Sequence, residues 1–139
     1  MDTTIGSSQK IVHKAGEDYL EAILILASSK GAVRSIDVAN FLNYSKPSVS
    51  RAVSVLKEAG YLMMDKDHFL YLTEEGKTIA EKIYERHRFF TDFLIRVGVD
   101  SETAERDACQ MEHAISAKSF EKLKEFLENH THQMEMPKL

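Results

Sequence analysis

The chain has a single cysteine and no long hydrophobic run among its 139 residues. One cysteine, Cys109, cannot form an internal disulfide, which fits a reducing compartment. The longest apolar run, Ala22–Ala27, is far shorter than the roughly 20 residues that a membrane-spanning helix needs. The first ten residues, MDTTIGSSQK, also lack the apolar core of a signal peptide. We therefore expect a soluble, cytoplasmic protein with no membrane partner.

The chain has fewer basic than acidic residues, 18 Lys and Arg against 22 Asp and Glu, so its formal net charge is -4. A protein that binds nucleic acid constitutively is usually basic, so any DNA binding by this chain must be local or conditional. The hydrophobic content of 43% supports one ordinary core, or two small lobes that share a helix. The sequence has neither internal repeats nor a low-complexity tract.

The first half has the order of elements of a winged helix-turn-helix. Apolar residues at helical spacing predict an opening helix that starts in GEDYLEAI and ends at SSKG. A short helix over residues 35–42 follows, with Ser35 as its expected N-cap, and Asn43 and Tyr44 make a tight turn. Ser45 is expected to cap a second helix, which Gly60 ends.

A small hairpin and a group of helices complete the expected fold. The apolar runs YLMM and HFLYL flank the charged turn at residues 65–67 and predict the hairpin. Thr73 then caps a long helix that reaches about Arg96, and Gly98 and Asp100 break it. Two further helices are expected over residues 101–114 and 118–129, before an unstructured tail that contains His130 and His132.

These patterns predict a mainly α protein in two domains. Residues 1–73 would form a winged helix-turn-helix with three helices and a short β-hairpin wing. Residues 74–139 would form a second, helical domain.

The helix-turn-helix is the basic part of this acidic chain. Residues 34–60 hold four basic and two acidic residues, so their net charge is +2 and that of the remainder is -6. The second helix, residues 45–57, contains no acidic residue, and small hydroxyl side chains on it allow close approach to a DNA groove. We expect Arg51 to read a base and Lys46 to meet phosphate. The candidate DNA-binding residues are Arg34, Ser45, Lys46, Ser48, Ser50, Arg51 and Ser54.

The alternative is that this helix simply has a solvated polar face. The hairpin does not decide the matter, because Asp65 and Asp67 would repel phosphate beside Lys66 and His68.

The sequence DACQMEHAIS places Cys109, Glu112 and His113 at positions i, i+3 and i+4. On a helix these positions share a face, and thiolate, carboxylate and imidazole all bind divalent metals. Asp18 and Glu21 are likewise three positions apart. The alternatives are a buried free cysteine beside an exposed Glu-His pair, and two acids that the dipole of the opening helix favours.

A mid-helix histidine, His87 in YERHRFF, completes an ordered set of motifs. The set also includes EDYLEAI, the helix-turn-helix, LTEEG and ACQMEHAIS. In this order the sequence resembles the diphtheria-toxin-repressor and manganese-transport-regulator family of metal-activated repressors. The resemblance covers nearly the whole chain. It implies a homodimer with N-terminal lobes that bind double-stranded operator DNA and C-terminal helical lobes that dimerise, with metal ligands at the lobe junction.

The resemblance also implies a ligand set. Asp18 and Glu21 match acidic ligands of the manganese branch, while Cys109 stands where the iron branch has cysteine and the manganese branch has glutamate. His87 matches a ligand that both branches share. The full set of candidate metal ligands is Asp18, Glu21, His87, Glu105, Cys109, Glu112 and His113.

The chain departs from both branches of the family. Thr91 and Glu105 stand where the ancillary site of the iron branch has glutamate and histidine, and Cys109 replaces the bridging carboxylate of the manganese branch. We therefore expect Fe(II) or Mn(II) at one or two sites per subunit.

The expected function is that of a metal-dependent repressor that controls metal homeostasis, and not that of an enzyme. A metalloenzyme built from the same residues is a rival, but the sequence supplies neither an obvious substrate pocket nor a nucleophile. A winged-helix interaction module, or a regulator that metal does not activate, is the other alternative.

Overall fold

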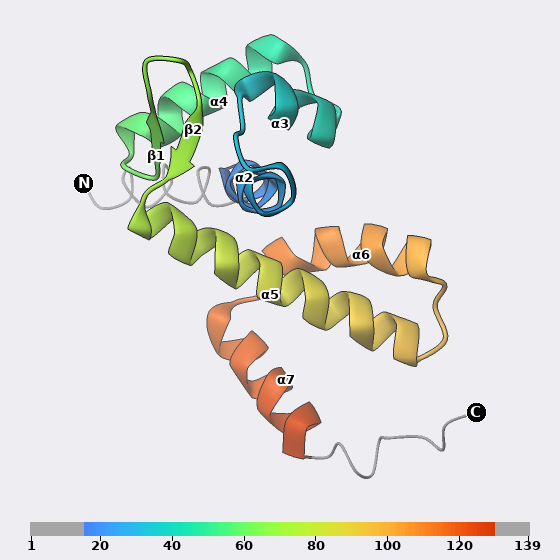
Figure 1. Cartoon of the computed structure of the whole chain (residues 1–139). Coiled ribbons are helices and arrows are strands. Elements are labelled where there is room, and N and C mark those ends of the chain that lie inside the picture. Colours follow the sequence, from blue (N-terminus) through green and yellow to red (C-terminus); the bar gives the residue numbers. More distant parts are fainter. Residues whose placement is uncertain (1–15, 130–139) are drawn as a thin grey trace. The chain divides into compact units, whose positions relative to one another are not determined.

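The computed structural model describes residues 16–129, so the tail histidines lie outside the described residues. It is mainly helical with one two-stranded sheet, as predicted (Figure 1). Two compact units, residues 1–85 and 86–139, divide the chain, and each is described by itself. The elements are α2 (Glu17–Lys30), α3 (Ser35–Leu42), α4 (Lys46–Glu58), β1 (Leu62–Met64), β2 (Leu70–Leu72), α5 (Glu74–Arg96), α6 (Ser101–Ala114) and α7 (Ala117–Asn129).

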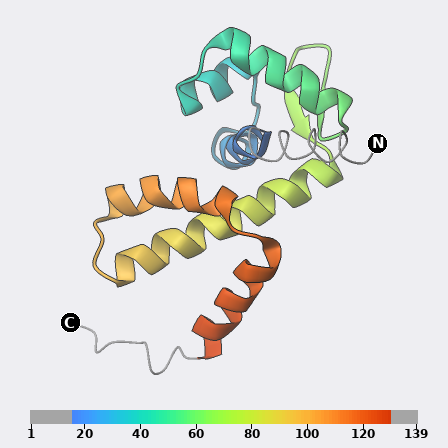
Figure 2. The same cartoon turned by 180° about the vertical axis from the view of Figure 1, so that it is seen from behind.

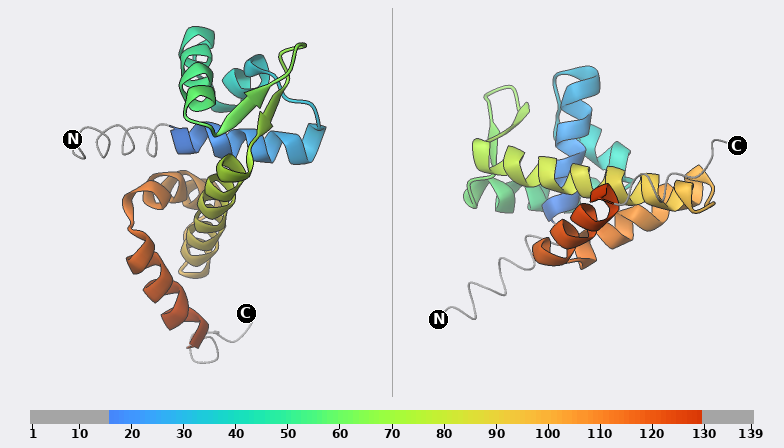
Figure 3. Two further views of the ribbon diagram at one scale, coloured as in Figure 1. Left: turned by 90° about the vertical axis from the view of Figure 1, so that its left-hand side faces the viewer. Right: turned by 90° about the horizontal axis from the view of Figure 1, so that it is seen from below.

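The first unit packs α2, α3 and α4 with the hairpin around one core (Figure 3). The predicted turn between α3 and α4 is confirmed, because Asn43 has the left-handed φ of 61° that ends α3. The predicted cap of α4 is confirmed as well, since the Ser48 amide donates to Ser45 Oγ at 3.2 Å. Pro47 lies in the first turn of α4, where its missing N–H leaves no helical hydrogen bond unmade.

The expected cap of α3 was wrong. Ser35 is already the first helical residue, and the residue before it, Arg34, takes the N-cap position in extended conformation. The Arg34 amide donates to Asp37 Oδ2 at 2.8 Å, because a carboxylate three residues into a helix reaches back to the capping amide. Lys30 adds an ion pair to Asp37 Oδ1 at 2.9 Å.

The hairpin is antiparallel and follows α4 directly, as predicted. Leu62 pairs with Leu72, and Met64 pairs with Leu70. Leu62 and Leu70 are buried in the core of the first unit. The Leu70 amide also donates to the carbonyl of Val33 at 2.8 Å, so the segment between α2 and α3 holds the hairpin from one side.

The second unit joins the C-terminal part of α5 to α6 and α7. In it, α6 turns back along α5 (Figures 1 and 2). Gly98, at φ 109°, and Asp100, whose Oδ2 accepts the Thr103 amide at 3.0 Å, make the predicted break before α6. One buried side chain from each helix, Phe90, Ala108 and Phe120, forms the core.

The predicted domain boundary after residue 73 coincides with the start of α5. Thr73 caps that helix, because its Oγ1 accepts the Gly76 amide at 3.1 Å. The two compact units instead divide after Glu85, inside the continuous helix α5. The domain boundary itself stays a prediction. Within residues 16–129, no helix is both long and apolar enough to span a membrane.

Gly76 provides a test of the packing between α5 and the hairpin. It is buried, and a Cβ there would overlap the carbonyl oxygen of Tyr61, which accepts the Thr73 amide at 3.1 Å. Gly76→Ala should therefore lower the free energy of unfolding by about 1–3 kcal/mol, although alanine normally stabilises a helix. Urea denaturation followed by circular dichroism measures the change.

The matched control is Glu75→Ala at the exposed neighbouring position of the same turn. It should leave stability within about 0.5 kcal/mol of the wild type. A Gly76→Ala variant as stable as this control would show that the Tyr61 carbonyl does not pack against α5 in this way.

Candidate metal centre and DNA-binding surface

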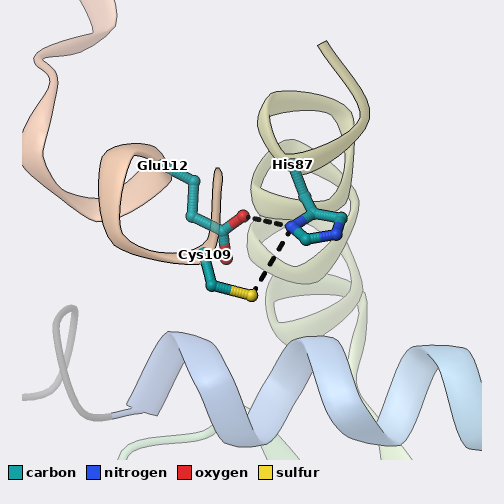
Figure 4. A group of neighbouring side chains, drawn as sticks. All are labelled: His87, Cys109 and Glu112. Atoms are coloured by element: carbon teal, nitrogen blue, oxygen red, sulfur yellow. Dashed lines mark hydrogen bonds and ion pairs between the residues drawn. The ribbon is translucent and has the colours of Figure 1, made fainter. Parts of the chain in front are cut away.

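A buried carboxylate on α6, that of Glu112, is the centre of the candidate metal site. Its Oε1 lies 2.9 Å from Nδ1 of His87 on α5 (Figure 4). Its Oε2 lies 3.3 Å from Nε2 of His113, the next residue along α6. Two imidazoles thus flank one carboxylate within the second unit.

Cys109 adds a sulfur to this group. It precedes Glu112 by three residues on α6, is exposed, and places Sγ 3.8 Å from His87 Nδ1 (Figure 4). The ligand atoms of His87, Cys109 and Glu112 all lie within 4.8 Å of one another. The shared face predicted for Cys109 and Glu112 is therefore present, and α5 brings the histidine to it.

The contacts set the charges of these groups. Burial raises the pKa of Glu112, but the interactions with the imidazoles of His113 and His87 outweigh burial and hold the pKa below its usual value. The hydrogen bond with Cys109, and then that with Glu112, raises the pKa of His87 to about 10 against the effect of burial. The carboxylate is thus an anion that favours the protonated form of His87.

The donor set fits a transition-metal ion. Oε2 of Glu112 is buried and has no hydrogen-bond partner among the described residues, although His113 lies near it. A bare carboxylate oxygen in a buried position is stabilised by a cation. Sulfur, imidazole nitrogen and carboxylate oxygen together suit first-row divalent ions better than Mg²⁺ or Ca²⁺.

Arg86, which was not among the predicted site residues, holds the end of α6 in place. Its guanidinium donates to the carbonyl of Glu112 at 3.1 Å and to that of Ile115 at 2.8 Å. It also lies 5.3 Å from the ring centre of Phe120. These carbonyls are among those that a helix C-terminus leaves unpaired. The only signal in the sequence is an arginine directly before His87.

The remaining predicted ligands lie on two helices. Asp18 and Glu21 are one turn apart on α2, in the first unit. Glu105 is exposed on α6, one turn before Cys109. Thr91 is buried on α5, and its hydroxyl has no hydrogen-bond partner within residues 16–129. The metal roles of all seven candidate residues stay predictions.

Except for Arg34, the predicted DNA-binding residues lie on α4 or at its N-cap. The apolar side of this helix enters the core through Val49, Val53 and Leu56. The opposite side is exposed and carries no acidic residue before Glu58, the last residue of the helix. The exposed polar residues of α4 are Lys46, Ser48, Ser50, Arg51, Ser54, Lys57 and Glu58.

Two predicted residues have structural contacts of their own. The Ser45 hydroxyl, besides capping α4, donates to Ser48 Oγ at 2.8 Å. The Arg34 guanidinium lies 4.2 Å from the ring centre of Phe69. Arg34 therefore packs on the hairpin and not on α4.

A winged helix-turn-helix followed by a helical unit that brings sulfur, nitrogen and oxygen atoms together is the architecture of a metal-responsive DNA-binding regulator. The family model described as "Iron dependent repressor, N-terminal DNA binding domain" matches residues 12–70. The model described as "Iron dependent repressor, metal binding and dimerisation domain" matches residues 73–137. The chain belongs to the iron-dependent repressor family, which consists of DNA-binding transcriptional regulators.

Known relatives agree with this assignment. The chain is 34% identical to the transcriptional regulator MntR of Salmonella typhimurium over 82% of its own length and 73% of that protein. It is 32% identical to the HTH-type regulator MntR of Lysinibacillus sphaericus, over 81% of each chain.

Solved structures of two metalloregulators have the same fold. The manganese regulator SloR matches 81% of this chain with a TM-score of 0.73 and 28% identity. IdeR of T. acidophilum matches 79% with a TM-score of 0.69 and 25% identity. This chain spans about half of each, 53% in both cases.

Replacement of the central carboxylate tests the site. Glu112→Gln keeps the size of the side chain but removes its charge, so the affinity for Mn(II) or Co(II) should fall by at least about tenfold. Isothermal titration calorimetry with MnCl2 and CoCl2 measures this loss of affinity. Glu102→Gln makes the same charge change at an exposed position in the first turn of α6 and should bind as the wild type does. Equal affinities for the two variants would remove Glu112 from the ligand set.

Proposed function

We propose that the protein is a metal-dependent transcriptional repressor that binds double-stranded operator DNA as a homodimer and controls metal homeostasis. One observation carries the proposal: the same chain holds the exposed side of α4, which has no acidic residue before Glu58, and the buried carboxylate with its imidazole and thiol neighbours. Membership of the iron-dependent repressor family supports both halves. A repressor acts on chromosomal DNA, so we place it in the cytoplasm.

Homodimerisation involves the second unit in this proposal. The family model that matches this part of the chain is described as a dimerisation domain. Large apolar side chains are exposed there, at Ile95, Val97 and Phe126, and exposed apolar residues of this kind are typical of interfaces.

The metal in this proposal is Fe(II) or Mn(II), at one or two sites per subunit. His87, Cys109, Glu112 and His113 would hold an ion, with Asp18, Glu21 and Glu105 as further ligands. When bound, the ion would supply the positive charge that the carboxylate of Glu112 otherwise draws from His87. A histidine nitrogen coordinates a metal only without its proton, so protonated His87 must release a proton when it binds the ion.

The ligands act on DNA binding through the conformations of the dimer. Two α4 helices must enter successive major grooves, about 34 Å apart. Ligand side chains that close on an ion select the conformers with this spacing. Metal and DNA should therefore each tighten the binding of the other by the same factor.

The proposed function and the role of α4 are tested together by fluorescence anisotropy on duplexes selected from a random pool. Wild-type protein should bind the selected duplex tightly with MnCl2, or with Fe(II) under anaerobic conditions, and weakly with EDTA. Arg51→Ala should weaken specific binding by about 1–3 kcal/mol and relax the sequence preference. Lys46→Ala should weaken all duplexes alike, because a phosphate contact carries no sequence information.

The control is Lys82→Ala, which removes one exposed positive charge from α5 outside the helix-turn-helix. DNA binding that is equal with metal and with EDTA would identify a regulator that metal does not activate. If Arg51→Ala and Lys46→Ala both bind like this control, α4 is not the recognition helix.

Cys109 is expected to set the metal preference. A thiolate favours Fe(II), Co(II) or Zn(II), whereas Mn(II) prefers oxygen ligands. Cys109→Glu should therefore raise the affinity for Mn(II) relative to Co(II), and Cys109→Ala should lower the affinity for both without unfolding the protein. Competition titrations under reducing conditions, with thermal melts, measure both effects. Unchanged metal affinity in Cys109→Ala would leave Cys109 as a thiol beside a site that other residues build.

A further inference from the structure

The tip of the hairpin is built around a single carboxylate, that of Asp65. Its Oδ1 accepts the amides of Asp67 and Phe69, each at 2.9 Å, and its Oδ2 accepts the Tyr71 hydroxyl at 3.1 Å. The main chain of Asp65 closes the same loop, because its amide donates to Phe69 O at 3.1 Å and its carbonyl accepts the His68 amide at 3.0 Å. Asp65 thus binds residues 67, 68 and 69 of the loop and Tyr71 in the second strand.

This loop has a conformation that needs such support. His68 has a φ of 71°, in the left-handed region that a residue with a side chain adopts at a cost. A left-handed residue at the end of a three-residue loop is a regular way to close a hairpin. Oδ1 of Asp65 accepts the amides on either side of His68 and so stabilises this arrangement.

The second strand of the hairpin is fixed to the helix-turn-helix at the end next to the tip. The Leu70 amide donates to Val33 O at 2.8 Å, and the Arg34 guanidinium stacks on the Phe69 ring at 4.2 Å. Val33 and Arg34 directly precede α3. A defined tip conformation therefore has a defined position relative to the start of α3 in the first unit.

We propose that Asp65 is a positioning residue for operator binding, which holds the hairpin tip in the shape that presents Lys66 to a DNA phosphate. This inference rests on the proposed function. It also reverses the expectation from charge alone, in which both aspartates of the tip oppose DNA binding. Only Asp67 should do so, because its carboxylate makes no hydrogen bond within the described part of the chain, whereas that of Asp65 makes three.

Electrostatics agrees with a carboxylate that acts through its acceptors. The hydrogen bond from the Phe69 amide is the first cause that lowers the pKa of Asp65, and the Tyr71 hydroxyl and the Asp67 amide add to it. Asp65 is therefore ionised at neutral pH, with its negative charge turned toward three donors of the loop. Lys66, the next residue, is exposed.

Three variants separate charge from shape. Asp65→Ala and Asp65→Asn remove the same charge, but asparagine keeps the carbonyl oxygen that accepts the Asp67 and Phe69 amides. Asp67→Ala removes an equal charge from the same loop without removing an acceptor in use. Each variant is titrated with the selected duplex in MnCl2, and circular dichroism melts confirm that each is folded at the temperature of the titration.

The expected duplex affinities differ between variants that remove the same charge. Asp65→Ala should bind the duplex at least about fivefold more weakly than Asp65→Asn, which corresponds to roughly one lost hydrogen bond. Asp65→Asn and Asp67→Ala should bind as tightly as the wild type or more tightly, since each removes a charge that repels phosphate. Equal affinities for Asp65→Ala and Asp65→Asn would overturn the proposal.

Salt dependence tests the contact that the tip is meant to make. Lys66→Ala should reduce the slope of log K against log salt concentration by about one, the effect of one lost phosphate contact. An unchanged slope would overturn the role of the tip. Wild-type protein that binds no duplex in MnCl2 or Fe(II) would overturn the proposed function and this inference together, whereas normal wild-type binding with equal Asp65 variants would overturn this inference alone.

Discussion

The carboxylate of Glu112 is an anion in a buried position, with an imidazole close to each of its two oxygens. A buried charge without a partner is costly, and here His87 Nδ1 at 2.9 Å and His113 Nε2 at 3.3 Å provide that partner. His87 belongs to α5 and Glu112 to α6, so the pairing also ties two helices of the second unit together. A metal ion bound between these groups would supply the positive charge that a proton on His87 otherwise supplies to the carboxylate.

Most of the fold was predictable because each element has a local cause. Apolar spacing, Ser45 and Gly60 define α4, and Gly98 with Asp100 separates α5 from α6. The cap of α3 was not predicted correctly, because serine is a common capping residue. The structure shows instead that the Asp37 carboxylate accepts the amide of the N-cap residue, Arg34. The hydrogen bonds of Asp65 were not predicted, for a related reason. Its charge is visible in the sequence, but the three donors that it meets are not.

The candidate site was predictable in part. The spacing of Cys109 and Glu112 implies a shared face of α6, and this follows from helix geometry alone. The approach of His87 depends on how α5 and α6 pack, which spacing within one helix does not specify, so the sequence pointed to it only through resemblance to a family. Arg86 had no such signal, since its partners are main-chain carbonyls that every residue possesses.

The hydrogen bonds from Arg86 to the end of α6 affect how the metal response can change during evolution. Because the guanidinium holds the carbonyls of Glu112 and Ile115, the direction of a predicted ligand depends on a residue that offers no metal-binding atom. Phe120, beneath the guanidinium, extends this dependence to α7. Selection for a different metal or a different threshold can therefore act on neighbours of the ligands, and two homologues with identical ligands need not respond alike.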